Sequence, residues 1–184
     1  MIHSIKCDKS SFKTVEFKPG FNVIIAERTK ESKQRDSRNG LGKSTLVEII
    51  HFCLGSKKSE TLSKKELNDW TFTMELDLMG KIYKINRNTL SPNKIIIDGD
   101  CSDWIIKPTI DKKTGNQVMS REEWTKALGS LMFNLQPIYD EYKYVPSFRS
   151  LISYFIRRNG QSGAFLNPFQ HYKNQLEWDK QVSN

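Results

Sequence analysis

The chain has 184 residues, which is long enough for a single domain with a substantial core. Lysine and arginine number 29 against 21 aspartate and glutamate residues, and the net charge of +8 favours an anionic partner such as a nucleotide or a nucleic acid. No apolar run approaches the ~20 residues of a membrane span, and the amino terminus lacks a signal-peptide core, so we expect a cytoplasmic protein without a membrane segment.

The cysteine pattern does not indicate a metal site. Cys7, Cys53 and Cys101 lie far apart and form no CxxC pair, and the three histidines are equally scattered. The sequence therefore shows no ligand set for zinc. Cys53 falls on the apolar face of a predicted helix, where we expect a core residue.

The first segments predict β-structure. Residues 1–7 and 12–17 are two short strand-like segments joined by a turn at 9–11. A Pro-Gly turn then precedes residues 21–26, FNVIIA, whose short β-branched run predicts a buried strand.

The next segment, 37–45, reads SRNGLGKST and matches most of the phosphate-binding pattern GxxxxGK[ST]. In that pattern glycines let backbone N–H groups surround the phosphates, the lysine reaches the β and γ oxygens, and the hydroxyl that follows binds Mg²⁺. The residues in these roles are Gly40, Gly42, Lys43, Ser44 and Thr45. Ser37 stands where the first glycine of the pattern belongs.

A helix is predicted directly after this loop. Leu46, Ile49, Ile50, Cys53 and Leu54 recur at helical spacing, and Gly55 occupies the position of a C-terminal cap. Strand, loop and helix thus follow in the order that a P-loop requires.

Residues 27–38 form a charged insertion between the predicted strand and the loop. Two interpretations stay open. The insertion is either a solvated loop or a lid near the phosphates, in which Arg38 is the residue best suited to help hold a triphosphate.

The middle of the chain predicts a hairpin. Residues 70–88 alternate apolar and polar side chains on either side of Met79-Gly80, and residues 94–98 predict another strand. That strand ends in Asp98-Gly99. Asp98 could be read as the acid of a Walker B strand, but Asp-Gly is also a strong turn signal, and we favour the turn.

Residues 56–69 are polar and predict a linker or a short helix. Ser120 and Glu123 form a capping box that opens a helix reaching about residue 133. A further helix is expected after residue 146 with Ser147 as its N-cap. Its inward-facing side chains are predicted to be Leu151, Ile152, Phe155 and Ile156. Residues 171–184 also have a helical pattern.

The order of these segments resembles the amino-terminal half of an SMC/RecN-type ABC ATPase head. The matching run is "SSFKTVEF", "KPGFNVIIA", "NGLGKSTLVEIIHFCLG" and the "MGKIYKINRN" hairpin, corresponding to the family's opening strands, GxNxIxG strand, P-loop with first helix, and β-subdomain. The insertion, with "DSRNGLGKST" and "IIHFCLG", looks most like the bacterial SMC-like ATPases of ABC-three-component and Lamassu-type antiphage defence systems.

The resemblance implies an α/β fold of the P-loop NTPase type, as the amino-terminal lobe of an ABC-type ATPase head with an antiparallel β-subdomain and flanking helices. It implies ATP and Mg²⁺ as ligands. By matching position, Lys43 would bind phosphates, Ser44 the Mg²⁺, and Asn39, Gly40 and Gly42 would form the phosphate cradle. The family also has a glutamine that helps to hold Mg²⁺, for which Gln161 is the candidate and Gln170 the second choice.

The same resemblance implies three segments: 1–56 with the P-loop and first helix, 57–118 as the β-subdomain, and 119–184 as a helical segment leading towards a coiled coil. In such heads a carboxyl-terminal lobe supplies Walker B, the signature motif and the catalytic glutamate. This sequence has no LSGG-like signature and no apolar run ending in Asp-Glu. We therefore expect no catalytic residue in this chain, and a composite ATPase site completed by another lobe.

Family resemblance further implies homodimerisation through the heads, DNA as a partner, and nuclease or other defence subunits. Two functions stay open: an ATPase that couples ATP binding and hydrolysis to DNA engagement, and a non-hydrolysing ATP-gated clamp that recruits an effector nuclease. A GTPase would need an NKxD-like motif, which is absent, and the hairpin region does not suggest the lid of a small kinase.

Overall fold

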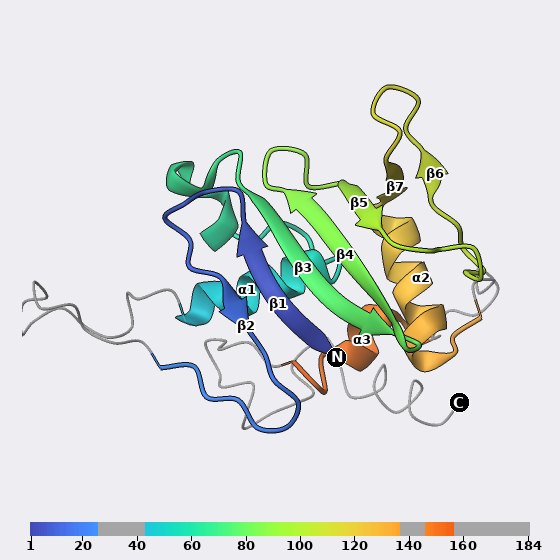
Figure 1. Ribbon diagram of the computed structural model, residues 1–184, viewed down its shortest axis with the longest axis horizontal. Coiled ribbons are helices and arrows are strands. Elements are labelled where there is room, and N and C mark those ends of the chain that lie inside the picture. The colour runs from blue at the N-terminus through green and yellow to red at the C-terminus, as the bar shows by residue number, and fades with distance from the viewer. Residues whose placement is uncertain (26–42, 137–145, 157–184) are drawn as a thin grey trace, which may run out of the picture.

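The computed structural model describes residues 1–25, 43–136 and 146–156 (Figure 1). These residues form a seven-stranded sheet in the order β2-β1-β3-β4-β5-β7-β6, in which all neighbouring strands are antiparallel. The strands are β1 (Ile2–Cys7), β2 (Val15–Glu16), β3 (Thr71–Leu78), β4 (Lys81–Asn88), β5 (Lys94–Asp98), β6 (Thr109–Ile110) and β7 (Gln117–Ser120). The helices are α1 (Lys43–Cys53), α2 (Arg121–Phe133) and α3 (Phe148–Ile152), with 3₁₀ turns η2 (Thr61–Ser63) and η3 (Lys65–Leu67).

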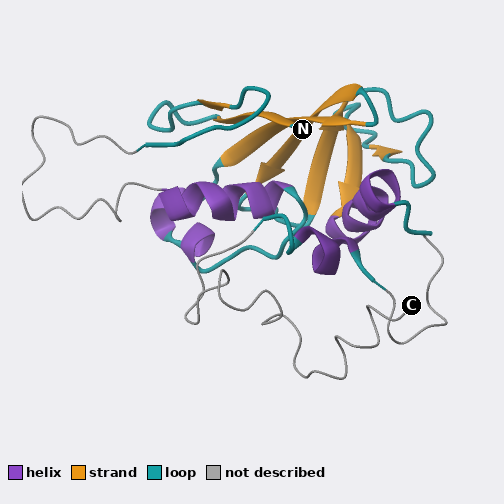
Figure 2. Cartoon of the chain, turned by 90° about the horizontal axis from the view of Figure 1, so that it is seen from below, coloured by secondary structure: helices purple, strands orange, loops and turns teal. Residues whose placement is uncertain are grey.

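The described helices cover one face of the sheet, and Figure 2 shows no helix on the other face. β3 explains this arrangement because its side chains alternate along the strand: the inward positions from Phe72 to Leu78 are buried, and the outward positions are polar and partly exposed. α1 packs on β3 and β4, and α2 lies over β5 and β7. The core therefore lies between this inner face and the helices.

The predicted hairpin is confirmed. β3 and β4 pair along their whole length, with Met74 opposite Ile85. Met79 and Gly80 both have positive φ, 53° and 79°, as a two-residue turn between right-twisted strands requires. Both opening strands are present, although the second, predicted over 12–17, is reduced to Val15–Glu16. β1 pairs with β3, so strands from the predicted segments 1–56 and 57–118 share one sheet.

The prediction of a buried strand at residues 21–26 is wrong for the described part, 21–25. This part has no strand assignment, and Phe21 is 93% exposed and Ile25 74% exposed. An apolar run becomes a buried strand only where a neighbouring strand pairs with it and another layer covers it. No described element does either for these residues.

The helix ends follow the predicted capping. Gly55 has a φ of 84° just after α1, and Ser56 N–H donates to the carbonyl of His51 at 2.9 Å. Ser120 and Glu123 form both hydrogen bonds of the capping box of α2. Ser147 caps α3, although α3 is short. Residues 56–69, predicted as a linker or a short helix, hold the two 3₁₀ turns.

One expected core residue of the last helix is wrong. Ile152 is buried and Ile156 partly buried, as predicted, but Phe155 is 73% exposed. α3 ends at Ile152, so helical spacing no longer determines where Phe155 points. Its ring instead stacks on that of Phe133 with centroids 6.0 Å apart.

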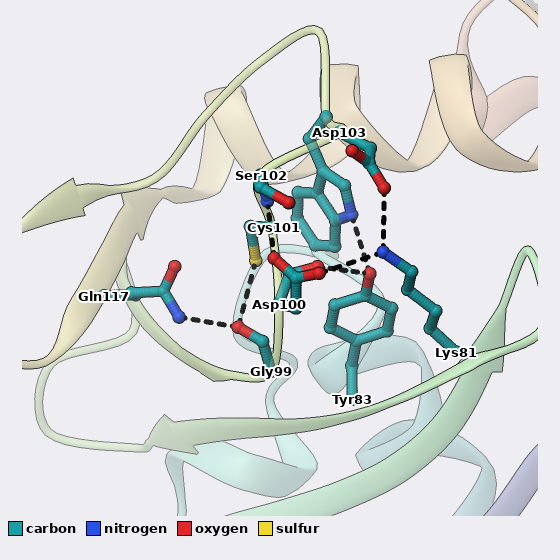
Figure 3. A network of polar contacts seen from close by, with 9 residues as sticks. Lys81, Tyr83, Gly99, Asp100, Cys101, Ser102, Asp103 and Gln117 are labelled. Carbon is teal, nitrogen blue, oxygen red and sulfur yellow. Dashed lines mark hydrogen bonds and ion pairs between the residues drawn. The ribbon is translucent and has the colours of Figure 1, made fainter.

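β5 pairs in antiparallel orientation with both β4 and β7, which agrees with its placement in a β-subdomain. The chain after it does not form a two-residue hairpin at Asp98-Gly99 but a longer loop that leads to β6. Figure 3 shows how this loop is held on β4. Lys81 Nζ pairs with Asp100 at 2.9 Å and with Asp103 at 2.7 Å, and the Tyr83 hydroxyl donates to the Asp100 carbonyl at 2.7 Å.

Candidate nucleotide-binding site

The described part of the candidate site is the amino end of α1. The helix begins at Lys43, Ser44 is exposed and Thr45 is half-buried. The first turn contains no acidic residue. The N–H groups of a first helical turn have no partner within the helix and carry a partial positive charge, so this end suits the oxygens of a phosphate, and the Ser44 hydroxyl is a suitable ligand for Mg²⁺.

The remaining predicted site residues lie outside the described residues. They are Arg38, Asn39, Gly40, Gly42, Gln161 and the alternative Gln170, together with the insertion 27–38 and the helical pattern at 171–184. The structure therefore brings together Lys43, Ser44 and Thr45 on one helical turn.

A turn built around Asn22 starts the run that leads towards the loop. The Asn22 side chain accepts a hydrogen bond from Lys18 N–H at 2.9 Å and donates to the carbonyls of Lys18 and Gly20 at 2.7 and 3.0 Å. Gly20 has a φ of 89°, which a glycine adopts without strain. These two residues, the Gly and Asn of the GxNxI match, thus fix the direction in which the chain leaves β2.

The other end of α1 is held by Arg87, which is not among the predicted site residues. Arg87 is 1% exposed, and its Nη1 donates to the carbonyl of Phe52 and, at 2.9 Å, to that of Ser56. The guanidinium carbon also lies 4.0 Å from the centroid of the Phe52 ring. Burial lowers the pKa of Arg87 to about 10, so the group stays charged at neutral pH beside the partial negative charge of the helix end.

The alternation of β4 is the sequence signal that could have revealed this arginine. Tyr83, Ile85 and Arg87 alternate with more exposed residues and therefore share the inner face of the strand. A charged residue in a row of core positions must find hydrogen-bond partners inside the protein. An arginine at such a position is therefore expected to hold a neighbouring element in place.

α2 fixes the same end of α1 from a second side. Trp124 is fully buried, and its Nε1–H donates to the Cys53 carbonyl at 2.9 Å. Gly55 passes so close to α2 that a Cβ there would lie 2.5 Å from Cγ2 of Thr125. Cys53 itself is a core residue, as expected, and burial raises its pKa to about 12. The amino end of α1 therefore belongs to a helix whose carboxyl end is held in place by β4 and α2.

The described ranges show neither a metal cluster nor a membrane span. They contain no group of three or more His, Cys, Asp or Glu side chains arranged to hold a metal ion. In residues 1–25, 43–136 and 146–156 no helix has the length and apolar character needed to cross a membrane.

Comparison with known proteins adds an independent observation. The family model described as an AAA domain matches residues 2–183, nearly the whole chain. The chain belongs to this family. Among curated proteins, this AAA domain is similar to the DNA double-strand break repair Rad50 ATPase of Sulfurisphaera tokodaii, with 37% identity over 86 residues.

That similarity covers 44% of this chain and only 8% of the length of the Rad50 ATPase. No solved structure matches the chain significantly. The two matches support an SMC/Rad50-like ATPase head, in agreement with the SMC part of the predicted SMC/RecN-type resemblance, whereas neither concerns antiphage defence.

Proposed function

We propose that the chain is the ATP-binding lobe of an SMC/Rad50-like ATPase head, which couples ATP binding and head dimerisation to engagement of DNA. The observation that carries this proposal is the start of α1 at Lys43, with Ser44 and Thr45 in its first turn, directly after the glycines of the P-loop sequence. In this proposal Lys43 binds the phosphates and Ser44 the Mg²⁺ ion that accompanies ATP. Arg38, Asn39, Gly40, Gly42, Thr45 and Gln161 complete the proposed ligand set.

The exposed run at residues 21–25 supports a composite site. Phe21, Val23 and Ile25 are 93%, 64% and 74% exposed, in the segment that precedes the P-loop in the sequence. Contiguous exposed apolar side chains usually mark a surface that another protein segment covers. We propose that residues 21–25 are covered by a strand of the second ATPase lobe. The same lobe also supplies the water-activating glutamate. This chain alone then binds ATP without appreciable turnover.

The finer assignments remain proposals of the same kind. The likeness to a DNA double-strand break repair ATPase favours a role in DNA repair, and the P-loop insertion favours antiphage defence with a nuclease partner. A hydrolysing head and an ATP-gated clamp differ in the second lobe, so turnover by the assembled head separates them.

The first test is ATP binding by the full chain. Mg-ATP affinity is measured by isothermal titration for the unmodified chain, for Lys43→Ala and for the control Lys57→Ala, an exposed lysine just beyond α1. We expect Lys43→Ala to weaken binding by about tenfold or more, because one charge-assisted contact to phosphate is lost. We expect Lys57→Ala to bind as the unmodified chain does. Equal affinity of the two variants would contradict the proposal.

A further inference from the structure

α1 is held near its carboxyl end by three elements, and they hold it in two different ways. Arg87 of β4 and Trp124 of α2 bond to main-chain carbonyls at the end of the helix. α3 instead contacts a side chain, because Arg149 Nη2 lies 3.1 Å from Nδ1 of His51. Main-chain bonds at the end of a helix fix its position along its axis. A bond to a side chain on its flank also restricts its rotation about that axis.

The contact defines the state of His51. The ring is 2% exposed, and a guanidinium can only donate hydrogen bonds. Nδ1 must therefore be the unprotonated nitrogen that accepts, and the imidazole is neutral in this contact. Protonation of Nδ1 would remove the acceptor and place two positive charges side by side.

Arg149 is well placed for this contact because α3 is itself oriented. Ser147 caps the helix through a hydrogen bond from Ser150 N–H at 3.1 Å. The preceding side chain, Phe148, is 2% exposed and packs against the Phe133 ring of α2 with centroids 6.0 Å apart. α3 is therefore anchored on α2 and reaches α1 through Arg149.

His51 lies on the same side of α1 as the candidate site. Ser44, Glu48 and His51 are spaced i, i+4 and i+7, which places them in one row along the helix. The apolar face of α1 also restricts rotation through buried side chains such as Ile49 and Phe52. The hydrogen bond at His51 adds a directional restraint on the row of residues that contains Ser44, and so on the direction of the Ser44 side chain.

We propose that Arg149 is a positioning residue of the nucleotide site, acting through His51 to set the rotation of α1 and so the direction of the Ser44 hydroxyl. The proposal rests on the proposed ATP-binding function of this helix. It gives α3 a role in nucleotide affinity although α3 does not contain any of the proposed ligands.

The test uses two substitutions of equal size at one position. In His51→Asn the amide oxygen lies one bond beyond Cγ, as Nδ1 does, so an acceptor for Arg149 is kept. In His51→Leu the shape is similar and the acceptor is lost. Mg-ATP affinity by isothermal titration and unfolding by urea are measured on the full chain for both variants, for Arg149→Ala and for the control Lys126→Ala, an exposed residue of α2.

We expect His51→Leu and Arg149→Ala to weaken Mg-ATP binding about fivefold or more, and His51→Asn to stay within about twofold of the unmodified chain, a coupling of ordinary size. The double variant His51→Leu, Arg149→Ala should bind no more weakly than either single variant, because both remove the same contact. Helix propensity and burial favour leucine over asparagine. His51→Leu should therefore have the higher urea midpoint of the two, although it binds Mg-ATP more weakly.

Three outcomes would overturn the proposal, and they differ in what they say about the site. If the unmodified chain binds Mg-ATP through Lys43 while His51→Leu and Arg149→Ala bind equally well, the proposed function stands and the positioning role is wrong. If affinity follows the urea midpoint across all variants, the contact is structural only. If the unmodified chain does not bind Mg-ATP, both proposals are wrong together.

Discussion

At the scale of single residues, Arg87 shows how a buried charge can be satisfied without a carboxylate. Its guanidinium donates to the carbonyls of Phe52, Ser56 and Pro92, which belong to the end of α1 and to the β4–β5 loop. Removing the side chain takes this donor from the Ser56 and Pro92 carbonyls in a region that water does not reach easily, whereas the Phe52 carbonyl still accepts from Gly55 N–H at 2.9 Å. The cost is expected to exceed that of an ordinary lost hydrogen bond.

We expect Arg87→Met to lower the free energy of unfolding by about 3 kcal/mol, within the range for breaking a buried, hydrogen-bonded charge. Urea denaturation followed by circular dichroism measures this change. The matched control is Lys84→Met on the outer face of the same strand, where an exposed substitution should change stability by less than about 0.5 kcal/mol. Similar losses in the two variants would show that Arg87 has no special structural role.

At the scale of elements, the start of α2 depends on a reciprocal pair of hydrogen bonds. Ser120 Oγ accepts from Glu123 N–H at 3.2 Å, and the Glu123 carboxylate accepts from Ser120 N–H at 2.8 Å. That second bond is the main reason why the pKa of Glu123 lies below its ordinary value of 4.5. The ionised carboxylate therefore stabilises the folded state.

We expect Ser120→Ala to lower the free energy of unfolding by about 1 kcal/mol at pH 7, the usual value of an N-cap. The contribution of Glu123 has a defined pH dependence. Because its pKa is lower in the folded than in the unfolded chain, its stabilisation is complete above the ordinary value of 4.5 and is lost as the pH falls below it.

Urea midpoints of the unmodified chain and of Glu123→Ala, measured from about pH 7 to about pH 3, test this expectation. The gap between the two midpoints should narrow as the solution becomes more acidic. Glu122→Ala serves as the control, because among the described residues the ion pair of Glu122 is with exposed Lys126 at 3.3 Å, and Glu122 takes no part in the cap. A gap for Glu123→Ala that stays constant over the whole range would contradict the assignment.

The elements that could be predicted from the sequence are those fixed by nearby residues. Ser120 and Glu123 lie within one helical turn, and Met79 and Gly80 form a turn between two strands with matching alternation. Gly55 could be predicted because the local backbone at the end of α1 requires a positive φ, although its close approach to α2 could not. In each case the local conformation that could be predicted is favoured by residues within a few positions of one another.

The features that could not be predicted depend on distant parts of the chain. The apolar run at 21–25 has the composition of a buried strand, but burial requires a partner that the described residues do not provide. Phe155 has helical spacing from Ile152 but lies beyond the end of α3. Of the candidate site, the P-loop sequence placed Lys43 at the start of a helix, whereas the link between His51 and Arg149 joins residues far apart in sequence and leaves no local pattern.

At the scale of the whole molecule, the exposed run at residues 21–25 provides a test of whether this chain is stable without a second lobe that covers it. The double substitution Phe21→Ser, Ile25→Ser should leave the free energy of unfolding within about 0.5 kcal/mol of the unmodified chain, because both side chains are exposed. It should also reduce self-association in sedimentation velocity, since an apolar surface is removed.

The matched comparison is Ile49→Ala, a residue of α1 that is 1% exposed and should cost about 3 kcal/mol through loss of core packing. If the double variant is destabilised as strongly as Ile49→Ala, residues 21–25 are packed in solution and the surface is not available to a second lobe.

The buried position of Trp124 allows the packing of α1 on α2 to be followed by intrinsic fluorescence, without an added label. This indole is enclosed in the core, donates its N–H to the Cys53 carbonyl, and stacks on Trp104 with centroids 6.0 Å apart. An enclosed indole fluoresces at shorter wavelength than one in water. Loosening of α1 from α2 would shift the emission of Trp124 towards the red, and comparison with Trp124→Phe separates this signal from that of the other three tryptophans.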